Sequence, residues 1–264
     1  MGQLLVVDVG NTNTVVGIYR DEQLQASWRL ATARDRTADE YGILTRQLVE
    51  DFVDDGFDGA IVSSVVPPLE PAIDSMIQRY FGVQPLFVRP GIKTGLAIHT
   101  ENPLEVGADR IVNAVACWSS FGGPSIVVDF GTATTFDVVS AQGEYRGGLI
   151  APGSTISFEA LFARAARLPR VEFRRPEHLI GTSTVTSMQS GMFYGYLGLV
   201  DGILERMIDE LGSVKRVVAT GGIAAVLAHE SSYIDEVDPV LTLKGLKLIW
   251  DRNQNQTGKR VRRR

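Results

Sequence analysis

One motif occurs twice in this sequence, and the distance between its copies restricts the folds that the chain can adopt. Residues 5–17 read LVVDVGNTNTVVG and residues 126–138 read IVVDFGTATTFDV. The matching positions are Asp8 with Asp129, Gly10 with Gly131, and Thr14 with Thr135. The copies are 121 residues apart, and two units of that length account for 242 of the 264 residues. A repeat of this length predicts a duplicated domain and not a solenoid of short repeats.

Each copy predicts a buried strand, a turn at the glycine and a second strand, because the flanking runs are rich in Val, Ile and Leu. Further strands are predicted over residues 59–65, 86–88 and 214–220, where Pro or Gly follows an apolar run. Segments that read as helices from their apolar spacing cover residues 39–53, 69–81, 108–121, 158–166, 188–211 and 223–229. Strands that alternate with helices predict a mixed α/β fold.

The Gly-Gly-Pro run at residues 122–124 indicates a boundary between the two repeats. We therefore expect one domain over residues 1–118, a second over residues 119–251, and a basic tail over residues 252–264. The tail is polar and lacks apolar periodicity, which predicts disorder. Removing its six positive charges from the net charge of −5 leaves −11 for the rest of the chain. A body this acidic is not expected to bind nucleic acid.

Cysteine usage and apolar run length indicate the compartment. Cys117 is the only cysteine, which excludes an intramolecular disulfide and fits a reducing cytosol. No apolar run approaches the roughly 20 residues that span a bilayer. The first apolar stretch stops at Asp8 and lacks the basic start of a secretory signal. We therefore expect a cytoplasmic protein with no membrane partner.

The Asp-x-Gly turns carry groups that suit a metal-bound polyphosphate. Gly10 lets backbone N–H groups approach an anion without a Cβ, and short polar side chains follow it. Asp8 is the expected Mg²⁺ residue and would act through water, because Mg²⁺ keeps part of its hydration shell. A hairpin whose Asp and Asn only satisfy the turn backbone is the alternative. Two matching copies favour binding, since paired loops can clamp one nucleotide from both sides.

Other phosphate-binding signatures are missing from the chain. It has no G-x-x-x-x-G-K-[ST] sequence, and no G-x-G-x-x-G follows the first predicted strand. Residues 219–224 read ATGGIA and place Gly221 and Gly222 between a predicted strand and a predicted helix. These glycines permit close approach of an adenine or ribose, and a tight strand-to-helix connection explains them as well.

Taken together, the DVGNTNT, DFGTATT and TGG turns resemble the superfamily of actin, sugar kinases and heat-shock ATPases. More narrowly, the chain resembles the type III pantothenate kinases over residues 4–248. The most specific blocks are NPLEVGADRIVNAVA at 102–116, residues 125–135, and GGLIAPG at 147–153. The resemblance implies duplicated ribonuclease-H-like domains with mixed sheets flanked by helices. It also implies ATP-dependent phosphorylation of pantothenate, the first step of coenzyme A synthesis, by a homodimer with its substrate site near the subunit interface.

The same resemblance assigns substrate-binding residues. Asp109 corresponds to the proton acceptor of the family, although its local sequence alone suits a helix N-cap. Arg110 would pair with the substrate carboxylate, and a surface salt bridge is its alternative. Gly107 and Ala108 would offer backbone contacts, and Thr184 matches a substrate-contacting threonine. The chain departs from the family at residues 182–183, where Thr-Ser replaces Lys-Asn, and at residue 100, where Thr stands in place of the Tyr of some members.

Nucleotide and cation contacts follow from the resemblance as well. Asp129 would help to hold a monovalent cation, K⁺ or NH₄⁺, with turn capping as its alternative. The complete set of expected ATP-binding residues is Asp8, Val9, Gly10, Asn11, Thr12, Asn13, Thr14, Val15, Thr132, Gly221 and Gly222.

Two other functions remain open from the residues. A kinase of another small alcohol or sugar has the same fold, because a fold does not determine a substrate. A non-catalytic accessory protein that binds nucleotide without turnover is the second alternative. The GADR sequence at residues 107–110 argues against the first, and the retained acids at positions 8, 109 and 129 argue against the second.

Overall fold

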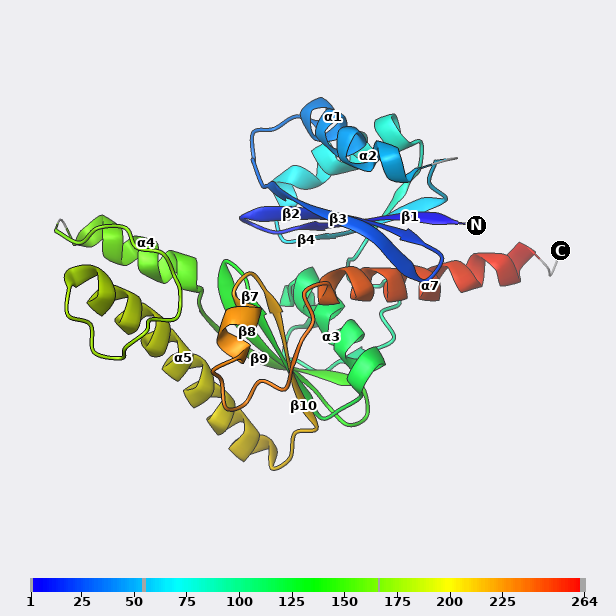
Figure 1. Cartoon of the computed structure of the whole chain (residues 1–264). Coiled ribbons are helices and arrows are strands. Elements are labelled where there is room, and N and C mark those ends of the chain that lie inside the picture. Colours follow the sequence, from blue (N-terminus) through cyan, green and yellow to red (C-terminus); the bar gives the residue numbers. More distant parts are fainter. Residues whose placement is uncertain (1, 54–55, 166, 262–264) are drawn as a thin grey trace. The chain divides into compact units, whose positions relative to one another are not determined.

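The chain divides into two compact units in the computed structural model, which describes residues 2–53, 56–165 and 167–261 (Figure 1). Met1–Ala116 and Val240–Arg264 form the first unit, and Cys117–Pro239 forms the second. The division near residue 117 lies close to the expected one. The C-terminal segment differs from the expectation, because it belongs to the first unit and not to the second.

The first unit contains a five-stranded sheet in the order β3-β2-β1-β4-β5. Its strands are β1 (Gln3–Val9), β2 (Asn13–Arg20), β3 (Gln23–Ala31), β4 (Gly59–Ser64) and β5 (Pro85–Phe87). The first three strands are antiparallel, whereas β4 runs parallel to β1 and β5 parallel to β4. A short strand β6 (Ala97–Ile98) and the 3₁₀ turns Glu50–Phe52, Pro67–Leu69 and Pro103–Glu105 complete the connections.

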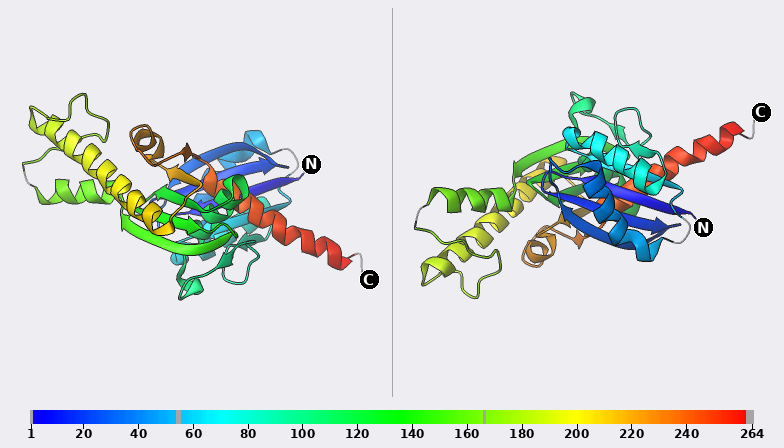
Figure 2. Two further views of the ribbon diagram at one scale, coloured as in Figure 1. Left: turned by 90° about the horizontal axis from the view of Figure 1, so that it is seen from below. Right: turned by 90° about the horizontal axis from the view of Figure 1, so that it is seen from above.

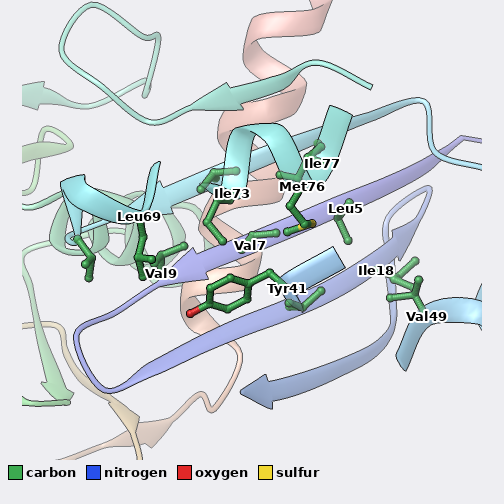
Figure 3. Close-up of a cluster of buried hydrophobic side chains, with 14 residues drawn as sticks. Leu5, Val7, Val9, Ile18, Tyr41, Val49, Leu69, Ile73, Met76 and Ile77 are labelled. Atoms are coloured by element: carbon green, nitrogen blue, oxygen red, sulfur yellow. The ribbon is translucent and has the colours of Figure 1, made fainter. Parts of the chain in front are cut away.

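Helices α1 (Ala38–Val49) and α2 (Glu70–Phe81) cover one face of this sheet. Leu5, Val7 and Val9 of β1 form a buried cluster with Tyr41 of α1 and Ile73 of α2, and these side chains point toward one another (Figure 3). Helix α1 begins at a capping box in which the Glu40 amide donates to Thr37 Oγ1 and the Thr37 amide donates to Glu40 Oε2. The capping box therefore fixes the start of α1, and the buried cluster shows which faces of α1 and α2 pack on the sheet.

Helix α7 (Leu241–Val261) packs on the same unit, which explains the assignment of the C-terminal segment. A Cβ on Gly17 of β2 would lie 3.0 Å from Leu243 Cδ1, and a Cβ on Gly59 of β4 would lie 2.1 Å from the Trp250 ring. Glycines on two strands thus make room for apolar side chains of α7. Lys247 of α7 is buried and bonds to Glu22 Oε1 at 2.9 Å and to Asp251 Oδ2 at 2.6 Å.

The predicted disorder of the C-terminal tail differs from the structure, in which helix continues through Val261. Asn253 Nδ2 donates to the Lys93 carbonyl at 3.1 Å, and the Arg252 guanidinium donates to the Thr94 carbonyl. These contacts hold the helix where the tail was expected to begin, and an established helix adds further residues at little cost. Residues 262–264 of the expected tail lie outside the described residues.

The second unit repeats the strand order of the first. Its strands β7 (Ser125–Phe130), β8 (Ala133–Val139), β9 (Glu144–Pro152), β10 (Arg216–Gly221) and β11 (Glu236–Val237) follow the order β11-β10-β7-β8-β9. Strands β7, β8 and β9 are antiparallel, and β10 and β11 are parallel to β7. The predicted duplication of an α/β, ribonuclease-H-like domain is therefore confirmed.

Three helices belong to the second unit, namely α4 (Ser154–Arg164), α5 (Thr184–Leu211) and α6 (Ala224–Ala228). Helices α4 and α5 lie side by side in the views of Figures 1 and 2. The core side chains on this sheet include Val128, Phe136, Phe193 and Leu204. Helix α3 (Ala108–Phe121) links the two units along the sequence. Among the described residues, every helix is too short or too polar to cross a membrane.

Replacing Gly59 by alanine tests the packing of α7 on β4. The added Cβ would lie 2.1 Å from the Trp250 ring, so that the ring or the helix must move. We expect the free energy of unfolding, measured by chemical denaturation, to fall by about 1–3 kcal/mol.

Gly198→Ala in α5 is the matched control, because its added Cβ meets no atom within 4 Å. The control should be neutral or should raise the free energy of unfolding by up to about 1 kcal/mol, since alanine favours helix over glycine. Equal stability of Gly59→Ala and the wild-type protein would contradict the packing.

Candidate active site

The first Asp-x-Gly turn joins β1 to β2 and is closed by its own backbone. Asp8 is half-buried near the end of β1, opposite Val15 of β2. The Gly10 amide donates to the Asn13 carbonyl at 3.0 Å. This bond leaves Asn11 and Thr12 exposed at the tip of the turn, where a phosphate can approach them.

Residues 32–34, which follow β3, hold this turn from the side. The Thr32 amide donates to the Thr12 carbonyl at 2.9 Å, and Thr32 Oγ1 donates to the Gly10 carbonyl at 2.8 Å. Arg34 Nη2 donates to Asn11 Oδ1 at 3.0 Å and so places a guanidinium beside the turn. Sequence reasoning missed Thr32 and Arg34. Their only signal in the sequence is a short polar and cationic run directly before the capping box of α1.

The second Asp-x-Gly turn joins β7 to β8 and is surrounded by glycines. The Gly131 amide donates to the Ala133 carbonyl at 3.1 Å. A Cβ on Gly153, at the end of β9, would lie 2.2 Å from the Thr132 carbonyl oxygen, so that only glycine fits there. Sequence reasoning placed Gly153 in a family-specific block but assigned it no contact with this turn.

Gly221 and Gly222 also meet the second turn. Gly221 has a φ of +95°, and a Cβ on it would lie 2.5 Å from the Phe130 carbonyl oxygen. The Gly222 amide donates to that same carbonyl at 3.1 Å. The structure therefore brings Asp129, Thr132, Gly221 and Gly222 to one end of the second sheet.

The two turns differ in length, so that one pair of residues matched by sequence does not match in space. Val9 is opposite Thr14 in the first hairpin, and Phe130 is opposite Thr134 in the second. Thr14 therefore corresponds in space to Thr134 and not to Thr135, because the second turn is one residue shorter. Both of these threonines are buried. The Thr14 hydroxyl bonds to that of Thr32 at 2.9 Å, and the Thr134 hydroxyl bonds to that of Tyr196.

Asp109 lies in the first turn of α3 and not at its N-cap. The Ile111 amide donates to the Gly107 carbonyl at 3.3 Å, which makes Gly107 the capping residue. Asp109 Oδ1 accepts from the Arg110 amide at 2.8 Å, and a Cβ on Gly107 would lie 2.6 Å from that oxygen. The simple N-cap interpretation of Asp109 therefore does not hold, and Gly107 makes the room that its carboxylate needs.

Burial raises the pKa of the Asp109 carboxyl above its usual range, although the Arg110 amide and guanidinium oppose this change. A carboxylate with a raised pKa is a stronger base than an exposed one, because it holds a proton more tightly.

Within the first unit, Asp109 lies close to the end of the strand that carries Asp8. The Val65 amide donates to the Val9 carbonyl at 3.0 Å, and a Cβ on Gly107 would lie 3.7 Å from Val65 Cγ1. Val65 thus connects the start of α3 to the carboxyl ends of β1 and β4. Ala108 and Arg110 share this position through their place in the first turn of α3.

Thr184 is the first residue of α5 and belongs to the second unit, whereas Asp109 belongs to the first. It lines a cavity of about 770 Å³ with Phe158, Leu161, Met188 and others. Ser183 caps α5, because its hydroxyl accepts from the Thr186 amide at 3.2 Å and Thr186 Oγ1 accepts from the Ser183 amide at 3.0 Å. The capping of α5 therefore explains a serine at position 183.

A family model for type III pantothenate kinases matches residues 4–206 of the chain. The chain belongs to the type III pantothenate kinase family. It is 56% identical over 272 residues to the type III pantothenate kinase of Koribacter versatilis (strain Ellin345), covering 97% of this chain and 98% of the relative. It is 58% identical over 256 residues to that of Anaeromyxobacter sp. (strain Fw109-5), covering 95% of this chain and all of the relative.

A more distant likeness shows the fold shared beyond the type III pantothenate kinases. The ethanolamine utilization protein EutJ from Carboxydothermus hydrogenoformans superposes with a TM-score of 0.57 at 14% identity. The match covers 94% of this chain and 90% of that one. At this identity the likeness shows a shared fold alone.

The acids of this chain are compatible with Mg²⁺ held partly through water. Across the described ranges, no three His, Cys, Asp or Glu side chains gather in one place. Asp8 would contribute one carboxylate beside the turn, and phosphate oxygens and water would have to complete the coordination. That pattern suits Mg²⁺, which is usually held by one or two carboxylates together with phosphates and water.

Replacing Thr32 by valine should loosen the first turn, because it removes the hydroxyl that bonds to Gly10 and Thr14. We expect the free energy of unfolding to fall by about 1–2 kcal/mol. The amides of residues 10–13 should also exchange with solvent faster, as hydrogen exchange would show. Ser27→Ala, at an exposed position on β3, should leave both quantities unchanged. Unaltered exchange in Thr32→Val would contradict the role of Thr32.

Proposed function

We propose that this chain transfers the γ-phosphoryl group of ATP to pantothenate and so forms 4′-phosphopantothenate, the first step of coenzyme A synthesis. Membership of the type III pantothenate kinase family supports the reaction. The observation that carries the proposal in the structure is the half-buried Asp109 beside the carboxyl ends of β1 and β4. A kinase for another alcohol would share the turns but would not be expected to share the GADR sequence.

The proposed nucleotide contacts are the turn at residues 8–15, Thr132, and the Gly221–Gly222 pair. Backbone amides and short polar side chains would bind the phosphates, and the glycine pair would allow the adenine or ribose to approach the backbone. Asp8 would hold Mg²⁺ through water, and the ion would offset negative charge on the phosphates. This arrangement suits an acidic protein, because it needs few lysines at the site.

Asp109 would remove the proton from the pantothenate hydroxyl as that oxygen attacks phosphorus. Arg110 would pair with the pantothenate carboxylate, since its planar guanidinium matches a carboxylate. Gly107 and Ala108 would contact the substrate through the backbone, and Thr184 through its hydroxyl. Orientation by these groups places the hydroxyl for in-line transfer, which is the largest task of a phosphoryl-transfer site.

Asp129 would hold K⁺ or NH₄⁺ near the phosphates. It occupies the position in β7 that Asp8 occupies in β1, with Thr135 and Thr220 as its strand neighbours. A carboxylate with neighbouring hydroxyls offers the oxygen ligands that a hard cation prefers.

We also propose a cytoplasmic homodimer that has neither nucleic acid nor membrane partners. The second unit exposes large apolar side chains around Thr184, among them Leu179, Ile180 and Val185. Ile180 is 82% exposed, and a group of exposed apolar side chains is typical of a surface that contacts another protein. A second copy on this surface would bring the substrate site close to the subunit interface.

Asp109→Asn tests the proposed base. The amide cannot accept the proton, so that turnover should fall by at least about 100-fold. The affinity for ATP, measured by calorimetry, should stay near the wild-type value, because Asp109 is not among the nucleotide contacts. Asp51→Asn, at an exposed position of the same unit, is the matched control and should leave both quantities unchanged.

The pH profile gives a second readout of the same residue. The base must be ionised, so that kcat/KM of the wild-type enzyme should rise with pH through a pKa above the usual aspartate range. A wild-type rate in Asp109→Asn would show that another group is the base.

Potassium dependence tests Asp129. The wild-type enzyme should be faster in potassium than in sodium buffer of equal ionic strength, and Asp129→Asn should lose this difference. Steady-state rates in the two buffers measure the effect. Equal rates of the wild-type enzyme in both buffers would contradict a cation role for Asp129.

A further inference from the structure

A serine hydroxyl lies directly beside the aspartate of the first turn. Strands β1 and β4 are parallel, and their register pairs Asp8 with Ser63. Paired residues of neighbouring strands point to the same face of a sheet. Leu5, Val7 and Val9 face the core under α1 and α2, so that Asp8 and Ser63 share the opposite face. That face is the one on which α7 packs, through Trp250 against Gly59.

The Ser63 side chain is fully buried, with 0% exposure, and its Oγ has no hydrogen-bond partner. Buried hydroxyls in folded proteins are nearly always bonded, and an unbonded one requires an explanation. The neighbouring Ser64 behaves normally, because its Oγ accepts from the Val66 amide at 3.2 Å. Among the two serines that end β4, the hydroxyl without a partner is therefore the one on the residue paired with Asp8.

The second unit repeats this pair. Strands β7 and β10 are parallel, and their register pairs Asp129 with Thr220, which is 3% exposed. Each unit thus places a buried hydroxyl from the adjacent parallel strand beside the motif aspartate. Strands β4 and β10 read GAIVSS and RVVATG. The fifth residue of each carries a hydroxyl, although most of the surrounding residues differ.

We infer that the Ser63 hydroxyl is a further residue of the nucleotide–metal site and accepts a hydrogen bond from a water molecule on the Mg²⁺ that Asp8 holds. This inference rests on the proposed function, because it requires Mg²⁺ and ATP at the Asp8 turn. Metal-bound water is a strong donor and needs acceptors around it. A serine oxygen supplies one without adding a negative charge that would repel the phosphates. The hydroxyl without a partner in the protein is then satisfied when the metal binds.

Ser63→Ala separates this role from a structural one. We expect the Kd for MgATP to rise about 10-fold, as is typical when a group that orients a metal ligand is removed. The Kd for ATP in the presence of EDTA should stay near the wild-type value. The Tm of the free protein should be unchanged or higher, because the substitution removes a buried hydroxyl that has no partner. Calorimetry gives both Kd values, and thermal denaturation gives the Tm.

Two variants serve as controls. Thr45→Val removes another buried hydroxyl without a partner, on α1 at the opposite face of the same sheet, and should change neither Kd. Ser63→Thr keeps the hydroxyl that the second unit carries at Thr220, and should bind MgATP more tightly than Ser63→Ala does.

Wild-type affinity of Ser63→Ala for MgATP would overturn the inference. An equal weakening of MgATP and of metal-free ATP would also overturn it, because Ser63 would then act on the shape of the turn and not on the metal. A wild-type protein that binds no ATP would overturn the proposed function itself and the inference with it.

Discussion

Side-chain alternation along β1 and β7 is the constraint on which both units depend. Each strand is buried and carries a single aspartate. Only one register turns this aspartate away from the buried apolar cluster. In β1, Val7 and Val9 pack under α1 and α2, while Asp8 takes the other face. A slip of one residue would move the carboxylate into the apolar cluster and the valines out of it. The packing of the core and the position of the candidate site are therefore decided together.

Both copies of the domain obey this constraint, but the residues around the aspartate differ between them. The five strands of each unit follow the same order, and each unit places a hydroxyl beside its aspartate, from Ser63 in one and Thr220 in the other. The first turn is one residue longer and is held from the side by residues 32–34. The second is shorter and is enclosed by Gly153 and Gly221. The same acid therefore has different surroundings in the two units.

The sequence was sufficient to predict the features that depend on residues close together in the chain. The strands around each glycine, the position of Asp8 and the duplicated fold follow from apolar runs and their spacing. Strand β3 was not predicted, although Leu24, Ala26, Trp28 and Leu30 alternate with polar or exposed residues as in a half-buried strand. Thr32, Ser63 and Gly153 could not be placed, since each reaches a turn through strand order and register. The same limit hid the return of α7 to the first unit, which depends on room above Gly17 and Gly59.

We propose that the site built on these strands phosphorylates pantothenate. A competition experiment tests this: the purified protein is supplied with ATP, Mg²⁺, K⁺ and an equimolar mixture of pantothenate, glycerol and a hexose, and the products are identified by mass spectrometry. We expect 4′-phosphopantothenate as the product, with one ADP formed for each molecule of it. Preferential phosphorylation of glycerol or the hexose, or ATP binding without any transfer, would contradict it.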